Sequence, residues 1–226
     1  DLQACLRYAE ELKSDGNDHF RAGSWNEALG VYRSGLGRLP PRKEKKTQDT
    51  DNETVAEGSD PIQDEDEEET ALDKECSSAR AVLNANIAAC YVKLVSIKPC
   101  SIGEHKEAVQ ACSQALLDDP EYVKALQRRA SSSEAIGTWS SLTTAQDDYN
   151  TLLKILPESD RRRGEISAAL HKLKPRLEDA QKRETTEMVD KLKGVGNSIL
   201  GEFGLSTDNF QFVPNGQGGY SVNFTQ

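Results

Sequence analysis

The sequence predicts an all-α fold, namely a superhelix of three helix pairs followed by C-terminal capping helices and a short C-terminal β-hairpin. Two observations carry this prediction. Apolar and small residues recur at helical spacing along most of the chain, and a triple of alanine, tyrosine or cysteine, and proline occurs three times with the same internal spacing. A hydrophobic fraction of 36% and a mean hydropathy of -0.68 fit a thin helical array with much exposed surface.

The repeated triple is the stronger of the two signals. In each copy the alanine lets two helices approach closely, the tyrosine or cysteine fills the next turn, and the proline ends the helix because it lacks a backbone donor. This spacing is typical of the second helix of a tetratricopeptide repeat (TPR). The triples are Ala28, Tyr32 and Pro40; Ala108, Cys112 and Pro120; and Ala145, Tyr149 and Pro157.

Residues 8–40 are predicted to form the first repeat, with one helix over 8–22 and a second from Trp25 to Leu39. Residues 41–77 then interrupt the array. Between Pro41 and Glu75 there are 14 acidic and 5 basic residues, a balance of -9 within a net charge of -10, and no aromatic residue. Because such a segment cannot bury enough apolar surface to fold, we expect an acidic disordered insertion.

Residues 78–157 are predicted to form the second and third repeats. The turn Val95–Gly103, inside the second repeat, is about eight residues longer than the standard repeat allows, and it contains Pro99. Helices are expected over Ala79–Leu94, Glu104–Leu117, Tyr122–Ile136 and Leu142–Leu156.

The rest of the chain is predicted to cap the array. Residues 158–203 are expected to form capping helices, because the last repeat would otherwise expose its apolar face, and Pro175 is expected to kink or restart the helix. Residues 204–226 alternate apolar and polar residues on both sides of a glycine-rich stretch, which indicates a short β-hairpin.

Charge and motif content exclude several classes of function. Outside the acidic segment the chain is nearly neutral, so no broad basic surface for nucleic acid is predicted. The five cysteines and three histidines are scattered without metal-ligand spacing, and no nucleophile-and-base motif is present. No apolar run is long enough for membrane insertion. We expect a cytoplasmic binding protein, not an enzyme, without a cofactor or a metal.

Candidate binding residues lie on the first helix of each repeat, which lines the concave face of a TPR superhelix. Lysine supplies charge, the asparagine amide supplies donors and arginine binds in a fork, so together they suit a carboxylate. The alternative for each residue alone is a solvated charge, or for Asn17 a local cap or packing contact. The candidates are Lys13 and Asn17 in the first repeat, Asn86 in the second, and Lys124 and Arg128 in the third.

These positions resemble the dicarboxylate clamp of the co-chaperone TPR family. Its K-x-x-G-N motif is matched by Lys13, Gly16 and Asn17, its single asparagine by Asn86, and its K-x-x-x-R motif by Lys124 and Arg128. The resemblance implies an adaptor whose groove binds the acidic C-terminal Glu-Glu-Val-Asp-type peptide of Hsp70 or Hsp90. It leaves open which of the two chaperones is preferred.

The end of the chain resembles the tetratricopeptide repeat protein 1 family, over Lys191–Asn197, Phe203–Gln211 and Gly219–Phe224. Members of that family are regarded as cytosolic adaptors. The resemblance implies a second hypothesis, a signalling scaffold that binds a Ras-like GTPase or a G-protein α subunit through the array or the C-terminal segment.

Overall fold

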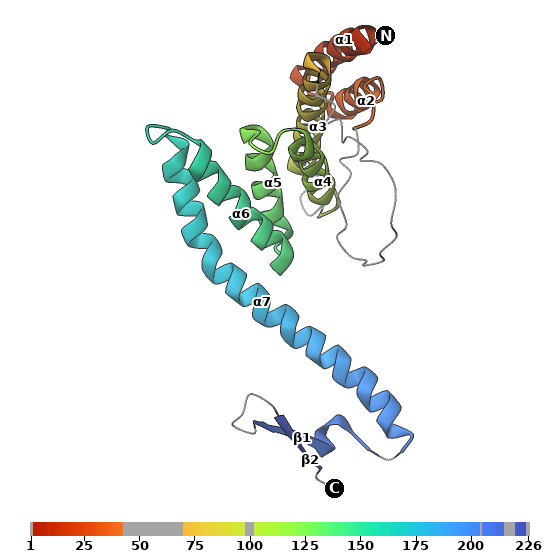
Figure 1. Cartoon of the computed structure of the whole chain (residues 1–226), viewed down its shortest axis with the longest axis vertical. Coiled ribbons are helices and arrows are strands. Elements are labelled where there is room, and N and C mark those ends of the chain that lie inside the picture. Colours follow the sequence, from red (N-terminus) through yellow and green to blue (C-terminus); the bar gives the residue numbers. More distant parts are fainter. Residues whose placement is uncertain (1, 43–69, 98–101, 204, 215–219, 225–226) are drawn as a thin grey trace, which may run out of the picture.

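The computed structural model describes residues 2–42, 70–97, 102–203, 205–214 and 220–224 (Figure 1). Among these residues no helix is both long and apolar enough to cross a membrane. The elements follow one another as α1 (Leu2–Arg21), α2 (Trp25–Leu36), α3 (Ala71–Ile97), α4 (Ile102–Asp118), α5 (Val123–Ile136), α6 (Trp139–Ile155), α7 (Arg162–Gly201), a 3-10 turn η1 (Thr207–Asn209), β1 (Phe210–Pro214) and β2 (Tyr220–Phe224).

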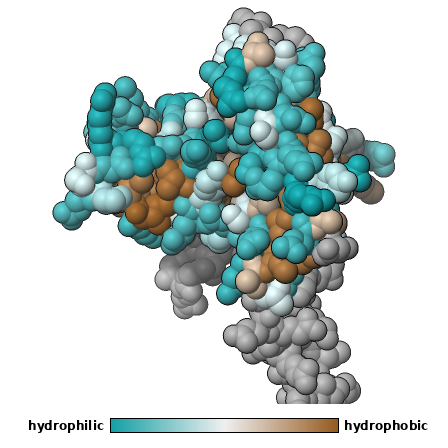
Figure 2. All heavy atoms as spheres, turned by 90° about the horizontal axis from the view of Figure 1, so that it is seen from above, coloured by the Kyte–Doolittle hydropathy of each residue, from teal (hydrophilic) through white to brown (hydrophobic). Residues whose placement is uncertain are grey.

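The first six helices form three consecutive pairs, and each pair packs against the next (Figure 1). The first helices of the pairs, α1, α3 and α5, also contact one another along the array. Seen from above, most of the displayed surface is hydrophilic, with separate hydrophobic areas (Figure 2). This arrangement confirms the predicted all-α superhelix of three helix pairs.

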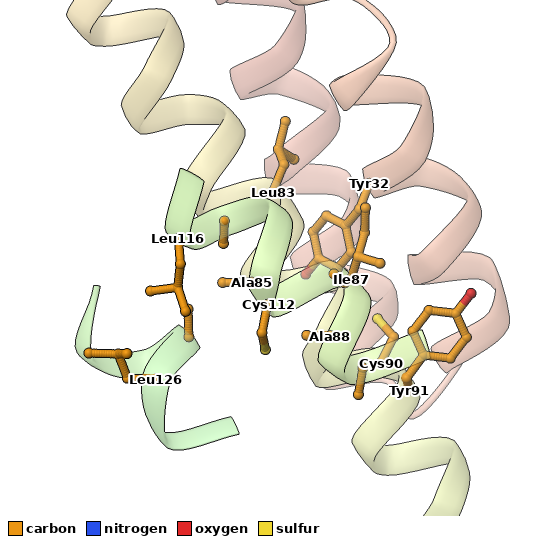
Figure 3. Packing of buried hydrophobic residues seen from close by; sticks show 14 of the residues in the cluster. Tyr32, Leu83, Ala85, Ile87, Ala88, Cys90, Tyr91, Cys112, Leu116 and Leu126 are labelled. Carbon is orange, nitrogen blue, oxygen red and sulfur yellow. The ribbon is translucent and has the colours of Figure 1, made fainter. Parts of the chain in front are cut away.

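The alanines of the repeated triples lie in the core, whereas Pro120 and Pro157 are exposed. The three alanines, Ala28, Ala108 and Ala145, have no exposed surface, so the helices cross closely at these positions. Tyr32 and Cys112 are also buried, and they meet side chains of α3 (Figure 3). One core cluster therefore joins the three repeats, and a second cluster, which contains Ala145, lies between the third repeat and α7.

The second repeat begins earlier than the sequence predicted. α3 starts at Ala71, not at Ala79, so the helix extends into the range 41–77 assigned to the disordered insertion, and for residues 71–77 that assignment is wrong. The Asp73 backbone N–H donates to Thr70 Oγ1 at 3.2 Å, and Thr70 Oγ1 donates to the Asp73 carboxylate at 2.8 Å. This reciprocal cap fixes the start of the helix. Residues 43–69 lie outside the described residues.

Other helix ends also differ from the predictions. α1 begins at Leu2, six residues before the predicted start, and α2 ends at Leu36, not at Leu39. α3 continues to Ile97 and α4 begins at Ile102, so helix occupies most of the expected turn Val95–Gly103. The residues between them lie outside the described ranges. α5 and α6 match their predicted ranges within three residues, because Gly137 (φ 73°) and the Thr138 N-cap mark the turn between them.

α7 is one helix of 40 residues with Pro175 inside it, so the expected pair of capping helices is replaced by a single one. Pro175 is exposed, and the helix is held against the array on both sides of it. Leu173 and Ala180 are buried, and Arg176 pairs with Glu134 of α5 at 2.7 Å. These contacts keep the helix continuous although Pro175 cannot donate its backbone hydrogen bond.

The second half of α7 projects beyond the array towards the C-terminal strands (Figure 1). β1 and β2 pair antiparallel, with Phe212 opposite Val222. The expected turn of the hairpin, residues 215–219, lies outside the described residues. η1 is tied to α7, because the Thr207 backbone N–H donates to Asn197 Oδ1 at 2.6 Å.

Candidate functional site

On α1, Lys13 and Asn17 lie one turn apart and each already has a partner within the protein. The Lys13 ammonium pairs with the Glu10 carboxylate at 2.5 Å, and 26% of the Lys13 side chain is exposed. Asn17 Oδ1 accepts a hydrogen bond of 2.7 Å from the Tyr32 hydroxyl of α2. Because the amide oxygen is used in this way, the Asn17 amide NH2 remains as a donor for a ligand.

Gly16 makes the contact between Tyr32 and Asn17 possible. A Cβ atom on Gly16 would lie 2.5 Å from the Tyr32 ring, which is closer than real Cβ atoms approach. The absent side chain lets the buried ring lie against α1, so its hydroxyl reaches the next residue, Asn17. This packing is a physical reason for the glycine in the K-x-x-G-N pattern.

On α3, Asn86 lies beside the point where the third repeat docks. Its side chain is partly buried and has no side-chain hydrogen bond among the described residues. The carbonyl of the preceding residue, Ala85, accepts a hydrogen bond of 3.0 Å from Arg128 Nη1 of α5. The guanidinium of Arg128 and the amide of Asn86 therefore lie on neighbouring parts of the α3–α5 contact.

Arg128 is also close enough to the first repeat to act on Tyr32 electrostatically. Burial raises the pKa of Tyr32 to about 12, and the positive charge of Arg128 opposes this rise. Burial likewise raises the pKa of the Cys90 thiol to about 12, again opposed by Arg128. The Arg128 guanidinium thus joins α5 to α3 through the Ala85 carbonyl, and its charge also acts on Tyr32 of the first repeat.

Lys124 lies one helical turn before Arg128 and is exposed. No ion pair or hydrogen bond joins its side chain to another described residue. Among the described residues, hydrogen bonds therefore join Asn17 to Tyr32 and Arg128 to the Ala85 carbonyl beside Asn86, but none joins the candidate residues to one another or to Lys124.

A cavity of about 800 Å³ lies between α1 and α3 on the side of Lys13. Its walls carry both signs of charge, from Arg7, Glu10 and Lys13 on α1 and from Glu75 on α3. Val82, one turn before Asn86, supplies an apolar wall. Of the five candidate residues only Lys13 lines this cavity, which offers room for a ligand beside it.

Two residues of this region were missed by the sequence reasoning. Tyr32 was interpreted only as a packing residue, although its hydroxyl orients Asn17. Glu10 was not considered, although it forms an ion pair with Lys13. The sequence carries one signal, a polar residue 15 positions before each repeat tyrosine. In the structure Tyr149 donates to Glu134 at 2.6 Å, as Tyr32 donates to Asn17. A polar residue 15 positions before the repeat tyrosine is thus a recurring contact in this array.

Comparison with known proteins gives relatives among TPR-containing proteins. No family model matches the chain. It is 32% identical over 146 residues to the mitochondrial import receptor subunit TOM34 of Rattus norvegicus, covering 65% of this chain and 34% of that protein. It is 30% identical over 145 residues to sperm-associated antigen 1 of Rattus norvegicus, covering 64% of this chain and 12% of that protein. The chain therefore spans at most about a third of the length of these relatives.

Among solved structures, the C-terminal TPR-containing domain of the Plasmodium falciparum putative FK506-binding protein PFL2275c superposes with a TM-score of 0.54. The match covers 80% of this chain and 96% of that domain, at 19% sequence identity. At this identity the likeness concerns the fold alone. Together with the three stacked helix pairs, it shows that this chain has the TPR fold.

Proposed function

We propose that this protein is a non-enzymatic, cytoplasmic adaptor whose TPR groove binds an acidic C-terminal peptide of the Glu-Glu-Val-Asp type, as carried by Hsp70 and Hsp90. Lys13, Asn17, Asn86, Lys124 and Arg128 would form the dicarboxylate clamp. The finer resemblance to the tetratricopeptide repeat protein 1 family is part of the same proposal. It rests on the sequence patterns at the end of the chain.

The observation that carries the proposal is the position of Arg128. Its guanidinium has five N–H donors, and only one hydrogen bond, from Nη1 to the Ala85 carbonyl, joins it to another described residue. That bond holds the side chain against α3 at the residue before Asn86, while leaving donors for a carboxylate. A partly buried arginine with unused donors suits a planar anion.

The expected affinity is moderate. Charge-assisted hydrogen bonds contribute roughly 1.5–3 kcal/mol each before the cost of ordering the peptide. Several such bonds, less that cost, correspond to a micromolar Kd, or about -8 kcal/mol. The cavity beside Lys13 gives residues upstream of the terminal carboxylate a place to contact α1 and α3.

The test is a calorimetric titration with peptides from the two chaperone tails, each with a free and with an amidated C-terminus. Amidation removes a charged oxygen, so binding is expected to weaken roughly 10- to 100-fold. The double variant Lys124→Ala, Arg128→Ala is expected to abolish binding. Lys154→Ala, an exposed lysine on the second helix of the third repeat, serves as the matched control. Binding that survives both amidation and the double variant contradicts the proposal.

The signalling-scaffold alternative has no support from the comparisons. A GTPase or Gα subunit as partner therefore remains a hypothesis from sequence resemblance alone.

A further inference from the structure

The cavity between α1 and α3 extends from Lys13 towards the starts of both helices. On α1 its lining residues reach from Lys13 back to Gln3, about 15 Å at 1.5 Å per residue. On α3 they begin with Glu75. Burial raises the pKa of the neighbouring Cys76 thiol, and Cys5 of α1 adds to the rise, so the starts of the two helices lie close together. Glu75 is therefore at the end of the cavity far from Lys13.

The size of this cavity suits one extended chain. About 800 Å³ distributed over about 15 Å gives a mean cross-section of about 50 Å². Packed strands occupy a similar cross-section, since they are spaced about 4.8 Å apart within a sheet and about 10 Å between sheets. A helix, with a diameter of about 10 Å or more, is too wide. At about 3.3 Å per residue the cavity accommodates four or five extended residues.

Two charged side chains in the cavity have no ion pair with any described residue. Arg7 and Glu75 both line it and are exposed. The Arg7 guanidinium carbon lies 5.9 Å from the centre of the Tyr8 ring, a contact that leaves the N–H donors of the arginine available. Lys13, in contrast, is already paired with Glu10. A cation and an anion at different distances from Lys13 therefore remain available to a ligand.

We propose that this cavity is the upstream part of the peptide site, in which Arg7 and Glu75 select the residues that precede the C-terminal valine and aspartate. The inference rests on the proposed function, because Lys13 must hold the terminal carboxylate. Arg7 lies about 9 Å along α1 from Lys13, which equals about three extended residues. The first glutamate of a Glu-Glu-Val-Asp sequence falls at that distance.

Glu75 extends the same register by one or two residues. Cys5 is about 12 Å from Lys13 along α1, and Glu75 lies near it, so Glu75 faces the residues directly upstream of the four-residue motif. A basic residue at that place pairs with Glu75, whereas an acidic residue is repelled. The preferred ligand is therefore an acidic C-terminal motif with a basic residue immediately before it.

The two charges are expected to determine which tail binds more than whether a tail binds. Exposed ion pairs contribute little and are screened by salt, so each contact changes affinity only a few-fold. Specificity is a difference between affinities, and repulsion at Glu75 contributes to it as much as attraction does.

The first test uses acetylated peptides of six residues that end in Glu-Glu-Val-Asp and begin with two lysines, two serines or two glutamates. Calorimetric titration of the full chain is expected to show the lysine peptide binding about three- to tenfold more tightly than the glutamate peptide, with serine between them. Glu75→Lys is expected to reverse this order. Glu178→Lys makes the same change of charge at an exposed position of α7 outside the cavity and is expected to preserve it.

The second test concerns Arg7. Replacing the first glutamate of the motif by glutamine is expected to weaken binding to the wild-type chain about two- to fivefold. Arg7→Gln is expected to remove this difference between the two peptides. Arg38→Gln, at an exposed arginine that follows α2, is the matched control and is expected to retain it. Circular dichroism checks that all variants keep their helix content.

Two results overturn the inference while leaving the proposed function intact. One is a peptide that binds with a free but not with an amidated C-terminus, yet whose upstream residues have no effect or the same effect in Glu75→Lys as in Glu178→Lys. The other is an Arg7→Gln variant that still distinguishes glutamate from glutamine. If none of the peptides binds, the proposed function is wrong and this inference falls with it.

Discussion

The hydroxyl of Tyr32 on α2 donates a hydrogen bond of 2.7 Å to the side-chain oxygen of Asn17 on α1. The bond crosses the first helix pair, and Gly16 allows it by leaving space for the tyrosine ring. It fixes which end of the Asn17 amide points away from Tyr32. A residue of the repeat core thereby orients a candidate binding residue.

Replacing Tyr32 by phenylalanine tests this relation. Tyr32→Phe keeps the ring but removes the donor, so the free energy of unfolding is expected to fall by about 1 kcal/mol. The Asn17 amide can then rotate so that its oxygen and nitrogen exchange places. Peptide affinity is therefore expected to fall about three- to tenfold, a loss of up to about 1.4 kcal/mol in binding free energy. Chemical denaturation and calorimetric titration measure the two effects.

The matched control is Tyr149→Phe, which removes the equivalent hydroxyl in the third repeat. Tyr149 donates to Glu134, which pairs with Arg176 of α7, so this contact belongs to the cap and not to the groove. A similar loss of stability without loss of peptide affinity is expected. Equal losses of affinity in both variants would show that Tyr32 acts only through stability.

Neutralising Glu10 is expected to strengthen peptide binding. Glu10 pairs with Lys13, so a ligand carboxylate must compete with it for the lysine. In Glu10→Gln that competition ends, and affinity is expected to rise about two- to fivefold, within the range of an exposed ion pair. The gain should shrink as salt is added, because exposed charges are screened.

Glu11→Gln is the control for Glu10→Gln. The neighbouring Glu11 is exposed and carries the same charge, but has no ion pair with Lys13 among the described residues. If the two variants strengthen binding equally, the effect comes from overall charge and the competition is absent.

The pair of Arg129 and Asp148 makes stability depend on pH. Arg129 donates two hydrogen bonds, of 2.9 and 2.6 Å, to the carboxylate of Asp148, which is 1% exposed. Burial raises the pKa of Asp148, and the hydrogen bonds from Arg129 oppose this rise. The folded protein therefore keeps this proton to higher pH than the unfolded chain, and ionisation of Asp148 lowers stability as the pH rises through its pKa.

Arg129→Met removes the opposing interaction and leaves a buried carboxylate without its partner. The free energy of unfolding is expected to fall by about 3–5 kcal/mol at neutral pH. Part of the loss should be regained on acidification, as Asp148 takes up a proton in the folded state. Thermal unfolding across the pH range measures this.

Arg162→Met removes an exposed partner, that of Asp160, and provides the comparison. Little change in stability is expected for it. A loss in Arg129→Met that is the same at every pH would contradict the explanation through Asp148.

Replacing Pro175 by alanine is expected to stabilise α7. The residue is exposed inside a continuous helix, so alanine restores a backbone donor without creating a cavity. A gain of about 1–3 kcal/mol in the free energy of unfolding is expected. A loss would show that the geometry around Pro175 is needed for the contact between Arg176 and Glu134.

The sequence predicted those parts of the fold whose signals are local. α5 and α6 match because a glycine with positive φ and a threonine cap bound their turn. The start of α3 was missed because its cap, Thr70 with Asp73, lies at the end of a long acidic stretch whose composition dominated the interpretation. The effect of Pro175 on the helix was overestimated, because the contacts that hold α7 on both sides of it come from other helices.

In the candidate site too, the sequence predicts some features and misses others. The residue types at Lys13, Asn17, Asn86, Lys124 and Arg128 can be found by aligning the repeats. Their partners come from other helices, so the bond from Arg128 to the Ala85 carbonyl cannot be predicted from spacing. The pairing of Lys13 with Glu10 was predictable in principle, since residues three apart share a helix face.

The length of α7 has a mechanical consequence. A helix of 40 residues spans about 60 Å at 1.5 Å per residue. Because it is continuous, it sets the distance between the third repeat, which its first half covers, and the C-terminal strands near its other end. Two objects held at these ends would be kept at a set separation, which a loose tether cannot do. Inserting or deleting whole helical turns would change that separation in steps of about 5.4 Å.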